Sequence, residues 1–286
     1  MRKSPYKKGA VAVKCGLRKN KSGWVQKYQC TETGKYFTVR DGFEKMKTKP
    51  EIIVDALDLR AKGLSLGKIA DFLQQKYGKK IGRDTILYWQ KKFGAKLQSF
   101  TSQFTLEHSE NTHVDEMFLK RKGAQIQEFT YYWCAIDYDT KLILADHISN
   151  WREEEECKSF LLKVRKRLKD PPINCHSDNS YDYPRPIRAV FGRKTQHIHF
   201  PAWKKQFKNN AIERYFNTVR EVTKNLRKFT NAQNMIAHLQ FFATYYNFIR
   251  PHKTLGGQTP AQVAGFGKWN WWTLIKARII FALYID

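Results

Sequence analysis

Three runs in which apolar and polar residues alternate follow one another in the middle of the chain. They span 112–119, 129–137 and 141–148, and turn residues such as Gly123 and Asp139 separate them. A period of two is typical of strands, and short turns favour antiparallel pairing of neighbouring strands. The sequence therefore predicts a three-stranded antiparallel meander, and the rest of the fold has to complete a sheet that begins in this way.

The pattern changes after the meander. Residues 152–168 carry apolar side chains on one helical stripe, and Pro171 and Pro172 end the predicted helix. Further elements are predicted in the order strand, helical turn, strand, helix and helix, at 173–178, 184–191, 196–200, 211–229 and 232–249. This order resembles that of ribonuclease-H-like proteins. We therefore expect an α/β fold with a mixed five-stranded sheet and flanking helices.

An all-α region is predicted before the sheet. Residues 50–94 read as three short helices, separated by residues that begin, cap or end helices, namely Pro50, Gly63, Ser65 and Gly78. Two short helices and a basic third helix resemble a helix-turn-helix, in which the third helix contacts DNA. The candidate DNA-binding residues are then Arg83, Thr85, Lys91 and Lys92. A plain three-helix bundle with a solvated basic face is the alternative.

Charge is unevenly distributed along the chain. The formal net charge is +26, from 52 Lys and Arg against 26 Asp and Glu, and residues 1–100 account for +16 of it. Residues 101–200 are neutral and residues 201–286 carry +10. Such an excess predicts a polyanionic partner, with nucleic acid ahead of a membrane surface, and it favours the DNA-binding interpretation of 50–94. The neutral centre indicates that some of its carboxylates serve metal binding.

The first 48 residues are predicted to form a small β module that resembles a zinc ribbon. Cys15 and Cys30 stand where two knuckles of such a ribbon would lie, but Ala12 and Thr33 occupy the partner positions. A structural zinc site needs four ligands, so two cysteines cannot complete one. We therefore interpret this segment as a degenerate ribbon and predict no zinc.

Three acids are candidates for a metal centre. Asp115 interrupts an apolar strand, Asp178 ends a short apolar strand, and Glu213 begins a helix. A carboxylate within a strand needs a partner, and sites in α/β sheets gather at strand ends. Glu213 leads a helical stripe that continues with Asn217, Arg220 and Lys224, beside a buried stripe. From this helix alone, a solvated surface with ordinary ion pairs would be the preferred interpretation.

The ordered set of motifs resembles the DDE transposases of prokaryotic insertion sequences, within the retroviral-integrase-like superfamily. The matching stretches are 113–116, Lys122-Gly123, 135–137, 176–179, 209–214 and 245–252. Asp178 and Glu213 have 34 residues between them, as in that family. The resemblance covers about 50–265 and is sharpest over 110–255.

The resemblance implies a catalytic and metal-binding triad of Asp115, Asp178 and Glu213. Three carboxylates can hold two Mg²⁺ or Mn²⁺ ions roughly 3.5–4 Å apart for in-line displacement at phosphorus. The basic residue seven positions after the glutamate is Arg220, and the resemblance extends DNA contact to Asn210 and Lys224. The partners implied are double-stranded DNA, as element ends and target, and further copies of the chain in a dimer or larger complex.

Other acids and histidines in the central region are assigned structural roles. Glu116 alternates to the opposite face of its strand from Asp115. Asp137, Asp139 and Asp182 are predicted in turns or loops, and Glu153–Glu156 form a solvated helix start. His176 is expected to be buried, although it points the same way as Asp178. No metal is assigned to His197 or His199.

The predicted domains are 1–48, 49–97, 105–255 and a C-terminal extension at 256–286. Residues 94–110 are expected to form a linker, and the apolar segment 269–285 a packing helix or strand, with an interfacial segment as the less favoured option. No signal peptide or membrane span is predicted, and the protein is expected in the cytoplasm of a prokaryote, associated with the nucleoid. Two rivals remain open, namely a catalytically silent DNA-binding regulator and a ribonuclease-H-like nuclease.

Overall fold

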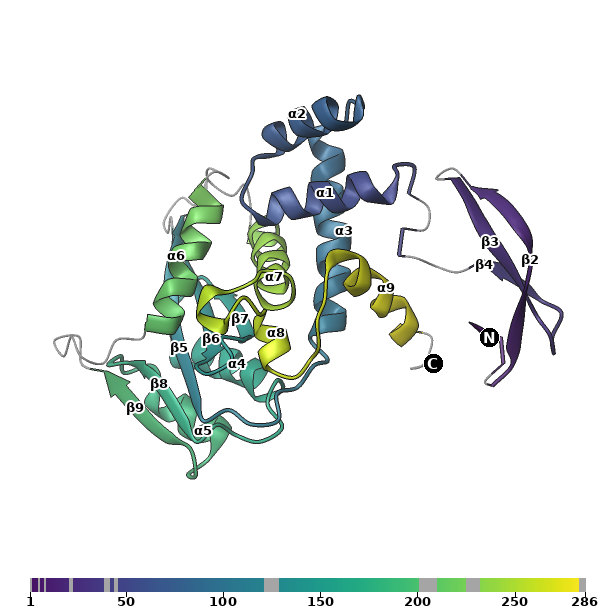
Figure 1. Ribbon diagram of the computed structural model, residues 1–286. Helices are drawn as coiled ribbons and strands as arrows, with labels where there is room; N and C mark the ends of the chain where they lie inside the picture. Colours follow the sequence, from purple (N-terminus) through teal and green to yellow (C-terminus); the bar gives the residue numbers. More distant parts are fainter. Residues whose placement is uncertain are drawn as a thin grey trace.

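The computed structural model describes residues 1–286 except 1, 5, 8, 21–22, 39–41, 44–45, 121–128, 201–209, 225–231 and 283–286. Its elements form a small N-terminal sheet, a helical region and a larger α/β unit (Figure 1). The turn predicted around Gly123 and the Lys122-Gly123 motif lie outside the described residues, as do Asn209 and the end of the helix predicted at 211–229.

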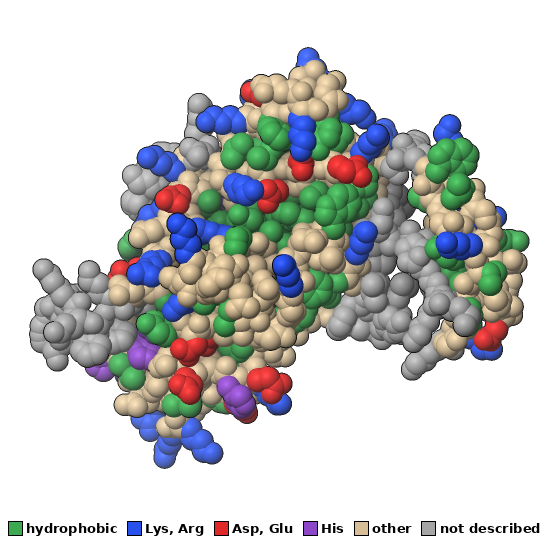
Figure 2. Space-filling model, viewed as in Figure 1, with side chains coloured by type: hydrophobic (Ala, Val, Ile, Leu, Met, Phe, Trp, Pro, Cys, Tyr) green, Lys and Arg blue, Asp and Glu red, His purple; other side chains and the backbone are tan. Residues whose placement is uncertain are grey.

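The N-terminal module is a four-stranded antiparallel sheet in the order β1-β2-β3-β4. Its strands are β1 (Arg2–Lys3), β2 (Val11–Asn20), β3 (Gly23–Cys30) and β4 (Tyr36–Thr38). Cys30 is buried and pairs across the ladder with Ala12, one of the positions where a ribbon would need a ligand. Apolar side chains remain on the surface of this sheet, as Figure 2 shows, and Leu17 and Trp24 are 61% and 66% exposed.

Three helices follow, as the sequence predicts. They are α1 (Pro50–Ala61), α2 (Leu66–Tyr77) and α3 (Arg83–Thr101). The residues predicted to begin and end these helices do so. The Ser65 side chain caps α2 by accepting a hydrogen bond from the Lys68 N–H, and Gly63 and Gly78, which follow α1 and α2, adopt φ of 87° and 64°. The predicted linker at 94–110 is wrong in its first part, because α3 continues to Thr101.

The central sheet has five strands in the order β7-β6-β5-β8-β9. They are β5 (Asn111–Lys120), β6 (Phe129–Asp137), β7 (Ile143–Ser149), β8 (Asn174–Asp178) and β9 (Gln196–Phe200). The first three pair antiparallel, whereas β8 pairs parallel to both β5 and β9. This is the mixed α/β sheet that the sequence predicts, with the meander on one side and the parallel strands on the other.

Helices cover both faces of the sheet. On one face lie α4 (Glu154–Arg165) and α5 (Pro184–Phe191), and on the other α6 (Asn210–Lys224) and α7 (Ala232–Phe248). The chain continues with the short η1 (Lys253–Leu255) and α8 (Pro260–Val263), and with α9 (Trp271–Ala282). One core lies under α4 and α5, and it includes Trp133, Phe160 and Tyr183. The other lies under α6 and α7 and continues without interruption into α1–α3 and α9. No helix within the described ranges combines the length and the apolar character that crossing a membrane requires.

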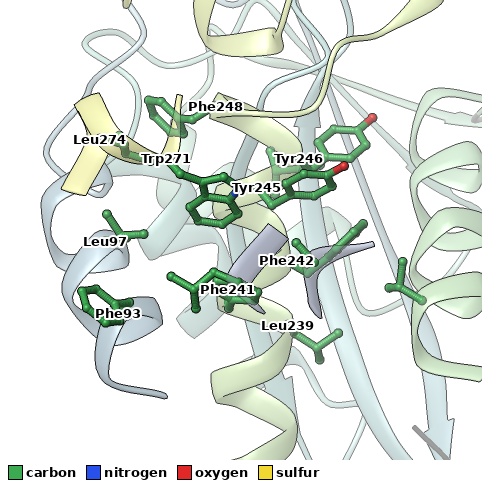
Figure 3. Packing of buried hydrophobic residues seen from close by; sticks show 14 of the residues in the cluster. Phe93, Leu97, Leu239, Phe241, Phe242, Tyr245, Tyr246, Phe248, Trp271 and Leu274 are labelled. Atoms are coloured by element: carbon green, nitrogen blue, oxygen red, sulfur yellow. The ribbon is translucent and has the colours of Figure 1, made fainter. Parts of the chain in front are cut away.

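The C-terminal helix α9 closes the second core, as the packing interpretation of 269–285 predicts. Figure 3 shows Trp271 lying against Phe241 and Tyr245 of α7, with ring centroids 5.5 and 6.2 Å apart. The Trp271 indole N–H also donates to Asp58 Oδ1 on α1 at 3.0 Å. The extension at 256–286 therefore contributes to the same core as the helical region.

Candidate active site

Asp115 and Asp178 occupy matching positions on neighbouring parallel strands. The ladder between β5 and β8 ends at the pair His113 and His176, and each aspartate lies two residues further along its strand. Side chains two residues apart share a face, so both carboxylates point the same way as these histidines. The two imidazoles stack with centroids 4.5 Å apart. The strands thus place two acids side by side where their pairing ends, which is where sites form in such sheets.

The environment of Asp115 disfavours an uncompensated negative charge. Its partner across the antiparallel ladder is Cys134, a buried residue of the core under α6 and α7. Burial raises the pKa of Asp115 to about 7, with further contributions from the charges of Glu116, Asp178 and Glu213, opposed by the Glu116 N–H that donates to it. A half-buried acid that is influenced by the charges of three other acids is suited to binding a cation.

Glu213 lies in the first turn of α6 and is not part of the close cluster of carboxylates formed by Asp115, Glu116 and Asp178. Ile212, Phe216 and Val219 are buried, while the stripe of Glu213, Asn217, Arg220 and Lys224 is exposed, as predicted. The Arg220 guanidinium donates to Asn217 Oδ1 at 2.8 Å. Because the charge of Glu213 contributes to the raised pKa of Asp115, its carboxylate lies within electrostatic range of the strand acids.

Glu116 lies on the other face of β5, as its position in the strand predicts. Its ladder partner is Trp133 in the core under α4 and α5, and its carboxylate accepts the Tyr183 hydroxyl. Burial raises the pKa of Glu116 against the effects of Tyr183 and Arg152. Nevertheless, carboxylate oxygens of Asp115, Glu116 and Asp178 all lie within 4.8 Å of one another. The sequence did not predict this proximity.

Arg152 joins the acids from the loop that precedes α4. Its Nη2 lies 2.6 Å from Glu116 Oε1 and 3.1 Å from Asp178 Oδ2, and its Nε lies 3.3 Å from Asp182 Oδ2. Asp178 also accepts the Ser180 N–H at 3.0 Å through Oδ1. Sequence reasoning missed Arg152. The available signal was an arginine directly before four glutamates at a helix N-terminus, where the helix dipole disfavours a cation.

The remaining acids of the central region have structural surroundings. Asp137 is buried and accepts Ser109 Oγ at 2.6 Å and the Thr140 N–H at 2.9 Å, which closes the turn predicted there. Asp146 on β7 was not singled out from the sequence. Burial raises the pKa of Asp146 to about 6, and it lines a separate pocket of about 410 Å³ between α3, α4 and α7.

Two of the histidines considered from the sequence contact neutral polar side chains. His176 is buried, as expected, and its Nε2 lies 3.0 Å from Asn111 Oδ1. His197 Nε2 lies 2.9 Å from Ser177 Oγ.

The candidate DNA-binding residues fall on two exposed surfaces. Arg83, Thr85 and Lys91 are exposed along the first half of α3, and Lys92 is half-buried beside Met46. Asn210, Arg220 and Lys224 are exposed along α6. On the face shown in Figure 2, Lys and Arg side chains are spread across the helical part.

Comparison with known proteins identifies a family for the central part of the chain. A family model described as a DDE domain matches residues 109–252, half of the chain. No curated protein sequence matches. Among solved structures, the catalytic core domain of BIV integrase is 14% identical with a TM-score of 0.40, covering 55% of this chain and 95% of that one.

Two other viral integrases give similar values. The HTLV-2 integrase catalytic core domain in complex with magnesium is 13% identical with a TM-score of 0.42, covering 56% of this chain and 99% of that one. The simian T-cell lymphotropic virus intasome is 13% identical with a TM-score of 0.41, covering 56% of each chain. These likenesses are distant, and the assignment rests on the DDE-domain match.

The matched segment contains both strand aspartates, Glu213 and the helices that cover the sheet. The chain therefore belongs to the DDE-domain family of transposases, whose acidic centre carries out metal-dependent transfer of DNA strands.

Proposed function

We propose that this chain cuts the ends of a mobile DNA element and joins them to target DNA, with Asp115, Asp178 and Glu213 as the metal-binding triad. The observation that supports this most strongly is the paired placement of Asp115 and Asp178 where β5 and β8 separate. The pKa of Asp115, raised to about 7 by burial and by the neighbouring acids, indicates a site built for added positive charge.

The residues fit a divalent metal of the hard class. Every donor that the triad offers is a carboxylate oxygen, the ligand type that suits Mg²⁺ and Mn²⁺. When bound, two such ions would activate the attacking hydroxyl or water and stabilise the charge on the leaving oxygen at phosphorus. The protein itself holds the acids in position, because two stand on one rigid sheet and the third on a helix packed against it.

The protonation of Asp115 links the site to pH. With a pKa of about 7, this carboxyl is mainly protonated below neutrality. Metal binding requires its ionised form, so the proton is released to solvent as the ion enters. Above pH 7, the carboxyl is mainly ionised, so the metal binds without releasing a proton from it.

DNA would be held by two surfaces. Arg83, Thr85, Lys91 and Lys92 on α3 are proposed to recognise the element ends, in the manner of a helix-turn-helix. Asn210, Arg220 and Lys224 on α6 are proposed to hold the phosphate backbone beside the triad. Because both element ends have to be joined, we propose a dimer or larger assembly on double-stranded DNA.

The rival interpretations predict different products. A silent regulator would bind DNA without cutting it, and the intact triad speaks against that interpretation. A general nuclease would cut without joining and would not need the exposed face of α3. Strand transfer is therefore the reaction that separates all three.

The test uses linear DNA carrying the inverted repeats that flank the coding sequence, a target plasmid and Mg²⁺. We expect joined products with the wild type and none in EDTA. Asp115→Asn and Asp178→Asn should each reduce joining by about 10²-fold or more, the range for loss of a charge-stabilising group. Asp139→Asn is the matched control, because Asp139 is an exposed turn residue. Cleavage or joining that survives both triad substitutions would reject the site.

A further inference from the structure

Arg152 and Glu116 form an arrangement beside the acids that the family assignment does not explain. The Glu116 side chain is 5% exposed, yet it is an acid, and it adjoins two proposed metal ligands. A buried carboxylate of this kind requires partners. Its partners come from two directions: Arg152 Nη2 at 2.6 Å and the hydroxyl of the fully buried Tyr183.

One guanidinium nitrogen serves two acids with different neighbours. Arg152 Nη2 lies 2.6 Å from Glu116 Oε1 and 3.1 Å from Asp178 Oδ2. Glu116 is held on the side of β5 covered by α4 and α5, whereas the Asp178 side chain is 47% exposed. The shorter contact is therefore made to the acid that solvent cannot reach, and the longer one to the acid that solvent can reach.

We propose that the ion pair with Arg152 prevents the Glu116 carboxylate from coordinating the metal. The ions are then bound by Asp115, Asp178 and Glu213. The inference rests on the proposed metal-binding function. Without the guanidinium, Glu116 would be a fourth acid whose oxygen lies within 4.8 Å of oxygens from Asp115 and Asp178. Its nearest source of positive charge would then be the metal itself. Arg152 is thus a positioning residue that sets which carboxylates face the ions.

The geometry explains why an arginine suits this role. The extended, planar guanidinium places two of its nitrogens within ion-pair distance of three acids: Nη2 lies beside Glu116 and Asp178, and Nε beside Asp182. A lysine would supply the same charge at a single point. It is expected to pair with the buried Glu116 and to release Asp178.

The test measures Mn²⁺ binding by the EPR signal of the free ion in the full-length protein without DNA. Arg152→Gln should bind Mn²⁺ about tenfold or more tightly, because a positive charge next to the ligands is removed and Glu116 becomes available. Glu116→Gln alone also removes a charge beside the ligands, so it should weaken Mn²⁺ binding by about tenfold at most, and by far less than Asp178→Asn does. The double variant, with both Arg152→Gln and Glu116→Gln, should bind Mn²⁺ less tightly than Arg152→Gln alone, because Glu116 can no longer coordinate the ion.

Controls separate charge from folding. Arg185→Gln removes a nearby arginine whose ion pair, with Glu154, lies outside the cluster, and it should leave binding unchanged. Arg152→Lys keeps the charge and should bind Mn²⁺ within about threefold of the wild type. Near-UV circular dichroism checks that each variant is folded.

Three results would overturn the inference. The first is Mn²⁺ binding by Glu116→Gln that is as weak as binding by Asp178→Asn, which would make Glu116 a ligand and can be read even if Arg152→Gln fails to fold. The second is weaker binding by a folded Arg152→Gln variant. The third is an affinity gain in Arg152→Gln that persists undiminished in the double variant. Absence of Mn²⁺ binding by the wild type, at the level of Asp115→Asn, would instead reject the proposed function.

Discussion

Replacing Asp115 by asparagine should stabilise the protein in the absence of metal. The folded protein raises the pKa of this carboxyl from 3.8 to about 7, which disfavours its charged form. Each pKa unit corresponds to about 1.4 kcal/mol, so the folded state loses up to about 4 kcal/mol once the group is ionised. This penalty is absent below pH 4, where both states are protonated. It grows between pH 4 and 7 and is complete above pH 7.

The assay is urea unfolding in EDTA, followed by tryptophan fluorescence at pH 8 and pH 4. We expect Asp115→Asn to raise the free energy of unfolding at pH 8 by about 2–4 kcal/mol and to leave it nearly unchanged at pH 4. Excess Mg²⁺ should narrow the difference at pH 8, because only the wild type gains from binding the ion. Asp71→Asn, at an exposed position of α2, serves as the control. A variant that is less stable than the wild type at pH 8 in EDTA would refute the reasoning.

Three further predictions concern the core and the DNA contacts. Trp271→Ala should lower the free energy of unfolding by about 3–5 kcal/mol in urea titrations, the range for a large aromatic removed from a core, whereas Trp271→Phe should lose less. Gln90→Leu should destabilise by about 2–3 kcal/mol, because Gln90 links the buried Arg60, at 2.7 Å, to His238, at 2.9 Å, and its loss leaves Arg60 without that partner. Lys91→Ala should weaken binding to all duplexes alike and lower the salt slope by about one in fluorescence anisotropy; an unchanged slope would place Lys91 away from the phosphates.

Local patterns were sufficient to predict most of the elements. The strand at 129–137 was predicted with its observed bounds, because its alternation ends at a turn that Asp137 and Thr140 close by hydrogen bonds. Gly63 and Gly78 were predicted to end helices, and both adopt the left-handed backbone that is common at helix ends. Such features depend on residues next to one another in the chain, and the sequence displays them directly.

The error at 94–110 has a different origin. The stretch is rich in serine, threonine and glutamine, which suggested a linker. In the structure, Leu97 and Phe100 are buried and continue the apolar stripe of α3 from Phe93. The polar residues between them occupy the remaining faces of the same helix. Tertiary packing against α7 and α9 therefore outweighs composition here.

The shared core also changes how the predicted domain split can be tested. Because α1–α3 pack in one core with α6, α7 and α9, deleting residues 1–97 would expose that core. Point substitutions on the exposed half of α3, such as Lys91→Ala, are the better test of end recognition. The boundaries at 49–97 and 105–255 stay predictions.

The acids could be predicted from the sequence, but their partners could not. Asp115 and Asp178 stand out because they interrupt or end apolar strands. The contact of Glu116 with Tyr183 joins residues 67 positions apart, and no local period encodes it. Arg152 approaches the acids from a loop whose course depends on how α4 packs. Long-range contacts of this kind become visible only when the sheet is assembled.

The proposed function depends most on Glu213, because Glu116 is the acid that lies closest to both Asp115 and Asp178 in the sheet. The most direct test is single-turnover strand transfer in Mg²⁺ by Glu213→Gln, beside Glu221→Gln as a matched control on the same helix. Glu221 is exposed on α6, eight residues further along. We predict that Glu213→Gln loses about 10²-fold or more of the joining rate and that Glu221→Gln keeps it. Joining by Glu213→Gln at the rate of the control would contradict the proposed triad.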